Sequence, residues 1–241
     1  MIDLDSSVLI AMGIIFLGAF VQTAIGFGLA IVSAPLLFHV SPEYVPAPII
    51  IAAFFITLLS TFRNRSNIEM GGLKSAIIGR IPGSVAGGFL LVYVSVDSLS
   101  LWLGIAVIIS LVLSLLPIRL EPTRNKMAVA GFLSGFMGTS SGIGGPPMAI
   151  LLQHQDANKF RGNLAAFFLF SSLMSLLVQF FVGYLTLNHF YLSLPLIPAA
   201  WLGYKTATLI VHRLSKQWIR WAALLLCFVS GAGAILESVI R

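Results

Sequence analysis

The sequence predicts an all-α integral membrane protein of two inverted repeats, each with one re-entrant, glycine-rich helical hairpin and three transmembrane helices. Three observations predict this fold: the composition, an internal duplication, and the placement of Lys and Arg. Of the 241 residues, 58% are hydrophobic and 9% are charged, whereas a soluble domain keeps roughly a quarter of its residues charged. The composition therefore fits lipid as the solvent.

Apolar blocks separated by short connectors fill the chain. They cover residues 8–38, 45–62, 73–95, 99–117, 127–152, 163–183, 190–210 and 217–237. Most are about 20 residues long, which is enough for a helix to cross roughly 30 Å of hydrocarbon. The connectors leave no room for a soluble catalytic domain. Asp3 and Asp5 stand where a signal peptide would carry bases, so no cleaved leader is expected.

The chain repeats itself at an offset of 116 residues. Shifting the sequence by this amount without gaps aligns Phe20 with Phe136, Thr23 with Thr139, Gly26 with Gly142, Gly28 with Gly144, Pro82 with Pro198, Gly87 with Gly203, and Trp102 with Trp218. Such internal similarity indicates a duplicated fold. We expect residues 1–117 to form the first membrane repeat, 118–126 a cytoplasmic linker, and 127–241 the second repeat.

Basic connectors follow opposite patterns in the two halves. In the first half, residues 63–74 and 118–126 carry the Lys and Arg side chains, and residues 39–44 and 95–98 carry none. In the second half the equivalents of the two empty connectors are basic, and residues 184–189, the equivalent of 63–74, hold no Lys or Arg. Eight simple crossings would place these bases on both sides of the membrane, against the positive-inside rule.

A re-entrant path for the two glycine-rich blocks brings the bases to one side. Blocks 8–38 and 127–152 are shorter than the roughly 40 residues that two crossings need, and they suit two half-helices that meet at a break. Each half then has three crossings and one hairpin, so the halves become inverted repeats. We expect a multi-pass protein of the cell (inner) membrane, with both termini outside the cytoplasm and the basic connectors inside it.

The glycine-rich segments are the predicted substrate site. A helix break frees backbone N–H and C=O groups, which are tolerated at membrane depth only where they line a cavity or pack within protein. The start of the following half-helix favours an anion. The candidate substrate-binding residues are Gln22, Thr23, Gly26, Gly28, Arg80, Thr139, Ser140, Ser141, Gly142 and Gly144. The alternative is that the glycines only allow close helix packing.

Two bases, Arg80 and Lys205, lie inside apolar blocks. Each could extend its side chain to the interface, or the pair could form a cationic entrance for an anion that leaves the cytoplasm. Residues 153–155 and 161–163 are polar and follow the second hairpin; an interfacial position is expected, and a gating role is the alternative.

Enzymatic, metal and nucleic-acid functions find no support. Residues 138–142 match G-x-S-x-G, but neither a strand-to-helix turn nor a positioned His accompanies them. No P-loop is present, and the His spacing makes no metal motif, so we expect no enzyme, cofactor or metal site. The net charge of +6 comes without a basic recognition motif, so no nucleic-acid partner is expected.

The second glycine-rich block contains GFLSGFMG at 131–138, which is followed by GIGGPP at 142–147. In these motifs it resembles the TauE/SafE family of membrane transporters. A weaker copy at 18–35 and the small-residue stretch 83–88 agree, and the resemblance covers essentially the whole chain. The first copy departs from the family pattern at Leu29 and Ala30, where a fuller glycine run is common. The resemblance implies a secondary transporter that exports a small anion, sulfite or an organosulfonate.

The predicted mechanism brings the two hairpin tips together near mid-membrane, where N–H groups and hydroxyls bind the anion and one repeat rocks against the other. No carboxylate lies deep in any block, so a buried proton relay is not expected. An inside-negative potential expels an anion with about 2.3 kcal/mol per charge per 100 mV. The alternatives are an anion channel of the same architecture and a membrane scaffold with packing glycines. A homodimer is one assembly compatible with the sequence.

Overall fold

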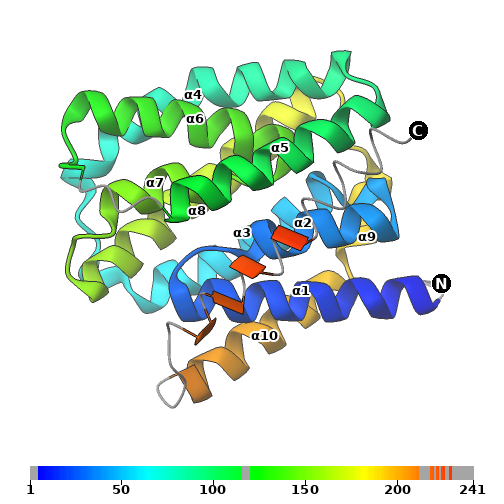
Figure 1. Ribbon diagram of the computed structural model, residues 1–241, viewed down its shortest axis with the longest axis horizontal. Helices are drawn as coiled ribbons and strands as arrows, with labels where there is room; N and C mark the ends of the chain where they lie inside the picture. Colours follow the sequence, from blue (N-terminus) through cyan, green and yellow to red (C-terminus); the bar gives the residue numbers. More distant parts are fainter. Residues whose placement is uncertain are drawn as a thin grey trace.

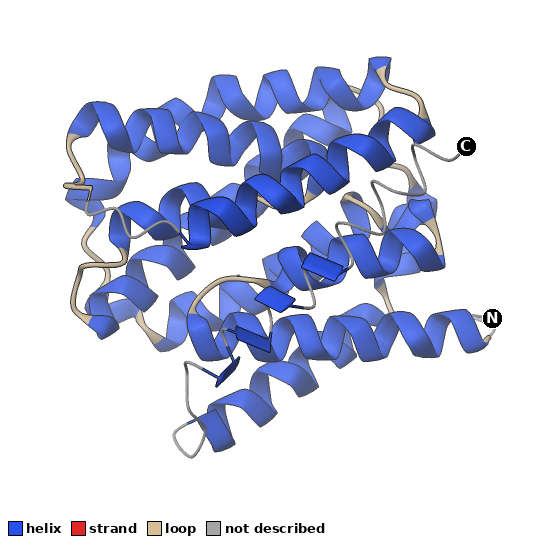
Figure 2. Ribbon diagram, viewed as in Figure 1, coloured by secondary structure: helices blue, strands red, loops and turns tan. Residues whose placement is uncertain are grey.

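The computed structural model describes residues 5–115 and 120–211, together with 218–219, 221–222, 224–225 and 228–229. Every regular element in these ranges is a helix (Figure 2). The predictions for the two termini, for most of block 217–237 and for part of the linker lie outside the described residues.

The helices follow one another with short connections (Figure 1). They are α1 (Ser6–Ile25), α2 (Leu29–Val40), α3 (Ala47–Arg63), α4 (Met70–Tyr93), α5 (Val96–Leu115), α6 (Arg124–Ser141), α7 (Gly145–Leu152), α8 (Ala157–Phe181), α9 (Leu187–Ser193) and α10 (Leu196–Ile210), with 3₁₀ turns η1 (Pro42–Tyr44) and η2 (Arg65–Asn67). Within the described residues, five segments are long and apolar enough to span a membrane: Ser6–Ile25, Pro42–Arg63, Gly71–Tyr93, Ser98–Leu115 and Ala157–Phe181. The prediction of an all-helical, multi-pass protein is confirmed.

Both glycine-rich blocks are broken helices. Gly26 ends α1 with φ 105°, and Gly142 ends α6 with φ 80°. Such positive φ values suit glycine because it has no Cβ. The two breaks fall at positions that the 116-residue offset makes equivalent. Their arms are unequal, 20 and 12 residues in the first block and 18 and 8 in the second. The first arms are therefore near the length of a full crossing and differ from the expected half-helices, because each break comes late in its block.

The two arms of each broken helix fold back on one another. In the first, the Ser33 hydroxyl of α2 donates to the Ile14 carbonyl of α1 at 3.2 Å. A side chain at Gly18 would overlap that hydroxyl, so glycine lets α1 and α2 approach. In the second, the Ser134 hydroxyl of α6 donates to the Gly144 carbonyl at the start of α7, at 2.5 Å. Each glycine-rich block is thus a compact helical hairpin.

A separate set of glycines packs α4 against α6. Cβ atoms at Gly79, Gly83 and Gly87 would overlap the carbonyl oxygens of Ala128, Phe132 and Phe136. The residue numbers rise together along both helices, so α4 and α6 run parallel, side by side at the top of Figure 1. Small residues allow such close backbone approach in membrane proteins. These three glycines have the packing role that the sequence offered as an alternative.

The buried apolar side chains form two clusters. One gathers Ile15, Leu29, Ile49 and Leu103, and the other gathers Leu73, Met148 and Phe167. The outer surface carries large apolar side chains such as Phe89, Leu133, Phe181 and Trp201. Apolar exteriors fit a lipid environment, where polar groups gather inside the bundle.

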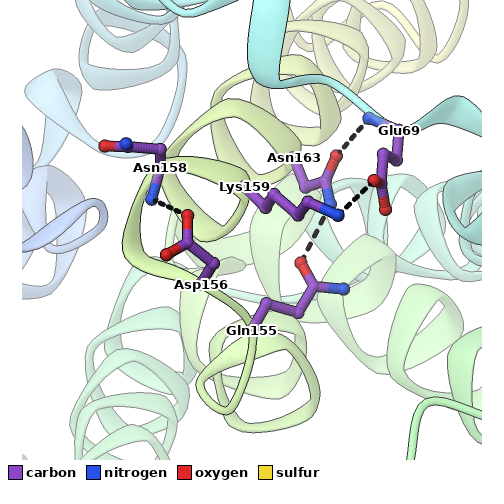
Figure 3. A network of polar contacts seen from close by, with 6 residues as sticks. All are labelled: Glu69, Gln155, Asp156, Asn158, Lys159 and Asn163. Carbon is purple, nitrogen blue, oxygen red and sulfur yellow. Dashed lines mark hydrogen bonds and ion pairs between the residues drawn. The ribbon is translucent and has the colours of Figure 1, made fainter.

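Polar contacts join two connectors at one end of the bundle (Figure 3). Asn163 Oδ1 accepts from the Glu69 backbone N–H at 2.8 Å, and Asn163 Nδ2 donates to Gln155 Oε1 at 2.9 Å. Lys159 Nζ lies 2.6 Å from Glu69 Oε1. Asn163 is buried, whereas about half of each ion-pair side chain is exposed. The amide therefore ties the α3–α4 connector to α8 more strongly than the ion pair does.

Replacing Asn163 with Ala is expected to destabilise the protein by about 1–3 kcal/mol, because the change removes both hydrogen bonds that this buried amide makes, to the Glu69 N–H and to Gln155. Lys159→Ala is the matched comparison, with an expected cost below about 1 kcal/mol for an exposed ion pair. Thermal unfolding of both purified variants in detergent micelles measures the difference. Equal melting temperatures for the two variants would contradict this assignment.

Candidate functional site

A buried arginine lies at the centre of the bundle. Arg80 of α4 is 2% exposed. Its Nη1 donates to Ser134 Oγ at 2.9 Å, and its Nη2 donates to the Ser171 carbonyl at 3.1 Å and to Ser175 Oγ at 3.0 Å. These partners come from α6 and α8, so three helices hold the guanidinium. The side chain does not extend to the interface, which excludes the snorkelling alternative for Arg80.

The partners of Arg80 are neutral. Among the described residues none of them is a carboxylate, and Nε has no hydrogen-bond partner. The Arg80 Cζ atom lies 5.7 Å from the Phe167 ring centroid, a further contact that leaves its charge uncompensated. Burying a charge without a counter-ion costs several kcal/mol. Such a residue within a membrane domain is a functional-site hypothesis by default.

Two glycines of α6 make room for this side chain. A Cβ at Gly135 would lie 3.1 Å from Arg80 Cγ, and one at Gly138 would lie 3.0 Å from Arg80 Nη2. Larger residues at either position would displace the guanidinium. The glycine-rich sequence of α6 thus serves Arg80 as well as the break that follows.

The guanidinium borders a cavity of about 70 Å³ between the two helix breaks. Arg80, Gln22, Gly28, Gly144, Ser171 and Ser175 are among its lining residues. The breaks themselves are in contact, since a Cβ at Gly145 would lie 3.4 Å from Phe27 Cβ. The cavity therefore brings together both hairpin tips, a cation and serine hydroxyls.

The two half-helices offer unequal donors to this cavity. At the start of α2, the Leu29 N–H donates to Gln22 Oε1 at 3.2 Å, so part of the free backbone is already satisfied. At the start of α7, Pro146 and Pro147 have no N–H group. The positive ends of both helix dipoles remain. The site therefore depends more on Arg80 and hydroxyls than on the backbone donors expected from the sequence.

The predicted site residues separate into three groups. Gln22, Gly28, Arg80, Gly142 and Gly144 line the cavity described above. Gln22, Thr23 and Gly26 line a second, adjacent cavity. The hydroxyls of Thr139, Ser140 and Ser141 line neither.

Those three hydroxyls bond to neighbouring helices or to their own. Thr139 Oγ1 and Ser175 Oγ are 2.9 Å apart, which connects Thr139 to Arg80 through one hydroxyl. Ser140 Oγ accepts from Trp102 Nε1 at 2.9 Å. Ser141 Oγ donates to the Met137 carbonyl at 2.7 Å. They hold α6 in place beside the cavity.

Sequence reasoning missed the hydroxyls that do line the cavity. They are Thr57 of α3 and Ser171, Ser172 and Ser175 of α8. The available signal was their spacing on one side of an otherwise apolar helix. Lys205, by contrast, is exposed, and its Nζ lies 4.8 Å from the Trp201 ring centroid. It lines neither cavity, so the predicted cationic entrance does not include it.

A second polar cluster joins connectors at the opposite end of the bundle (Figure 1). Asn188 Nδ2 donates to Glu43 Oε2 at 3.0 Å, and the Tyr184 hydroxyl donates to the Val45 carbonyl at 3.1 Å. Burial, with a smaller contribution from the Glu43 charge, raises the pKa of Tyr184 to about 12. Tyr184 is therefore a neutral hydrogen-bond donor at physiological pH.

The fold and the cavity define a class: a polytopic membrane protein in which two broken helices and a buried cation enclose a polar site. The chain matches the family model of the sulfite exporter TauE/SafE over residues 11–234, and it belongs to that family. Members of this family are transporters, so the chain is a transmembrane transporter and not an enzyme. Comparison with curated proteins and with solved structures gives no match.

Gln22→Glu is expected to weaken anion binding about tenfold or more, because it puts a negative charge at the cavity wall beside Arg80. The carboxylate still accepts a hydrogen bond from the Leu29 N–H, so the hairpin is expected to stay folded. Isothermal titration of the purified variant with sulfite measures the affinity, and Gln22→Met serves as the uncharged control. Wild-type affinity in the Glu variant would show that this wall does not face the anion.

Proposed function

We propose that the chain is a secondary transporter that exports a small anion, sulfite or an organosulfonate, which binds at Arg80 between the two helix breaks. The observation that carries this proposal is the buried guanidinium beside a polar cavity, with neutral partners throughout. An anion in that cavity would supply the missing counter-charge. Family membership supports the same ligand class.

The cavity favours sulfite over larger zwitterionic sulfonates. Its volume of about 70 Å³ is roughly five times what one water needs, which suits an oxyanion of a few atoms. Its described lining residues include no Asp or Glu, so among them the ammonium group of an aminosulfonate would have no counter-charge. A single guanidinium with nearby hydroxyls suits a compact oxyanion.

We further propose that the two halves are inverted repeats with re-entrant hairpins. Under the 116-residue offset, α1 corresponds to α6, and α4 corresponds to α9 and α10. The offset therefore maps the close α4–α6 pair onto the pair of α10 and α1. That second pair is also close, since a Cβ at Gly203 would overlap the Phe16 carbonyl oxygen. Such an exchange is what two halves related by a two-fold axis would produce. Rocking of one repeat about the fixed cavity would then give alternating access.

Uptake of radiolabelled sulfite into proteoliposomes tests the transport proposal. We expect the uptake rate to saturate with sulfite concentration at a low turnover number, and to depend on an imposed membrane potential. A flux that does not saturate would favour the anion channel. The absence of any flux, with correctly folded protein, would favour the membrane scaffold.

Cysteine labelling tests the topology. In a Cys227→Ser background, Asp97→Cys is expected to react with an impermeant maleimide from outside intact cells. Arg124→Cys is expected to react only after permeabilisation. The reverse labelling pattern would contradict the proposed orientation. Light scattering of the same purified protein would decide whether it is a homodimer.

A further inference from the structure

A second polar cavity adjoins the one at Arg80. Its volume is about 80 Å³. Gln22, Thr57 and Phe168 line both cavities, so these three side chains form the wall between them. The second cavity extends from this wall toward the end of α3 and the start of α8, where the basic connectors lie. An ion that leaves the Arg80 cavity past this wall enters the second cavity directly.

Two arginines line the second cavity. Arg63 is the last residue of α3 and is exposed, and Arg161 lies in the second turn of α8 and is half-buried. Among the described residues, the lining includes no Asp or Glu. Within residues 5–115 and 120–211, the ion pair that the structure shows is Lys159–Glu69, which leaves both arginines without a carboxylate partner. The charge of this cavity is therefore net positive.

The remaining lining is polar and uncharged. Ser60, Asn64, Tyr204 and Thr208 contribute hydroxyl and amide groups. The Asn64 amide nitrogen donates to the Ser60 carbonyl at 2.8 Å, which fixes the amide at the end of α3 next to Arg63. Arginine forks together with neutral donors are suited to oxyanions. A cleft lined by one sign of charge also raises the local concentration of the opposite ion.

We propose that this second cavity is an anion-binding vestibule, in which Arg63 and Arg161 capture the oxyanion before it passes Gln22, Thr57 and Phe168 to reach Arg80. The inference rests on the proposed transport function and adds a second binding site to its route. It also assigns the cationic entrance to two arginines other than the Arg80 and Lys205 pair that the sequence suggested. The shared wall with the Arg80 cavity favours the transported anion as ligand over the phosphate of a lipid headgroup, which has the same chemistry.

The test compares charge-removal variants by transport kinetics. The variants are Arg63→Gln, Arg161→Gln and the double variant, assayed with radiolabelled sulfite in neutral phosphatidylcholine proteoliposomes. We expect the double variant to raise KM about tenfold, to leave kcat within about twofold, and to flatten the dependence of kcat/KM on ionic strength. Each single variant is expected to have a smaller effect of the same kind. Arg63→Lys with Arg161→Lys is expected to recover most of the salt dependence.

Arg65→Gln is the matched control. Arg65 lies two residues from Arg63 in the same basic connector, but it lines a separate, largely apolar groove. Its removal changes the net charge equally and is expected to leave KM within about twofold. An equal rise in KM for Arg65→Gln would mean that the loss of any nearby positive charge explains the effect, and it would refute the proposed vestibule.

Two further outcomes would overturn the inference. One is wild-type KM and salt dependence in the folded double variant, as checked by its melting temperature. The other is an effect that is present with anionic phosphatidylglycerol and lost in neutral lipid, which would assign the arginines to headgroups. Two controls separate this failure from that of the transport proposal. Sulfite uptake by the wild type, lost in Arg80→Gln, keeps the central site whatever the vestibule variants do. Absence of uptake by the wild type would refute the transport proposal, and wild-type uptake by Arg80→Gln would refute binding at Arg80.

Discussion

Arg80→Gln is expected to lower sulfite affinity about 100-fold or more and to abolish transport, while the protein stays folded. Each charge-assisted hydrogen bond from a guanidinium to an oxyanion contributes about 1.5–3 kcal/mol. The substitution removes two such bonds, together with the one charge that the described residues bring to the cavity lining. Isothermal titration and proteoliposome uptake measure the two losses.

The same substitution is not expected to reduce stability. The described partners of Arg80 are neutral, so the native protein bears the cost of a buried charge without an ion pair. Ser134 and Ser175 keep their bonds to the Gly144 carbonyl and to Thr139, and we expect an unchanged or higher melting temperature. A function that is lost without a loss of stability distinguishes a ligand site from a structural one.

Arg80→Lys is the control that retains the charge. The ammonium group keeps the electrostatic attraction but lacks the planar fork, so an affinity about tenfold below wild type is expected. The assignment would be refuted if Arg80→Gln bound sulfite like the wild type, or if it unfolded while Arg80→Lys remained fully active.

Gly83→Ala is expected to destabilise the protein by about 3 kcal/mol or more and to reduce the yield of monodisperse protein. The added Cβ would overlap the Phe132 carbonyl oxygen, and it would lie 2.9 Å from Phe132 Cα. Relief requires α4 and α6 to separate, because the clash is with backbone and not with a flexible side chain. Overpacking of this kind costs about 1–3 kcal/mol in ordinary cores, and rigid backbone contacts lie at the upper end.

Gly72→Ala, on the same helix, is the matched control. No atom lies within 4 Å of a Cβ at Gly72. Because alanine favours a helix by about 1 kcal/mol over glycine, this variant is expected to be neutral or slightly stabilised. Melting temperatures in detergent compare the two variants. A Gly83→Ala protein as stable as Gly72→Ala would mean that α4 and α6 do not pack as described.

The helical fold and the positions of both breaks could be predicted from the sequence. Apolar length determines the spans, and Gly26, Gly28 and Gly142 adopt positive φ at the breaks. The unequal arms could not be predicted, because composition locates a block but not the point at which its helix ends. Folding back depends on contacts such as Ser33 with Ile14, which pair residues 19 positions apart.

The site was predictable only in part for a similar reason. Arg80 was conspicuous as a charge inside an apolar block, and its burial follows from that position. The direction of a hydroxyl is different, because one residue turns a helix by about 100° and the sequence does not give the rotation of α6. Ser140 therefore faces Trp102 of α5. The serines of α8 were overlooked because serine in a membrane helix commonly bonds to its own backbone, as Ser172 does to Phe168.

The hydroxyl of Ser134 joins the guanidinium to the second hairpin. It accepts from Arg80 Nη1 at 2.9 Å and donates to the Gly144 carbonyl at 2.5 Å. A shift of the hairpin tip by about 1 Å would take one of these bonds beyond hydrogen-bonding range. An anion that draws Arg80 away from Ser134 would loosen the tip, and a displaced tip would free Arg80 for the anion. Anion binding at Arg80 and the position of the second hairpin would then be thermodynamically linked through the Ser134 hydroxyl.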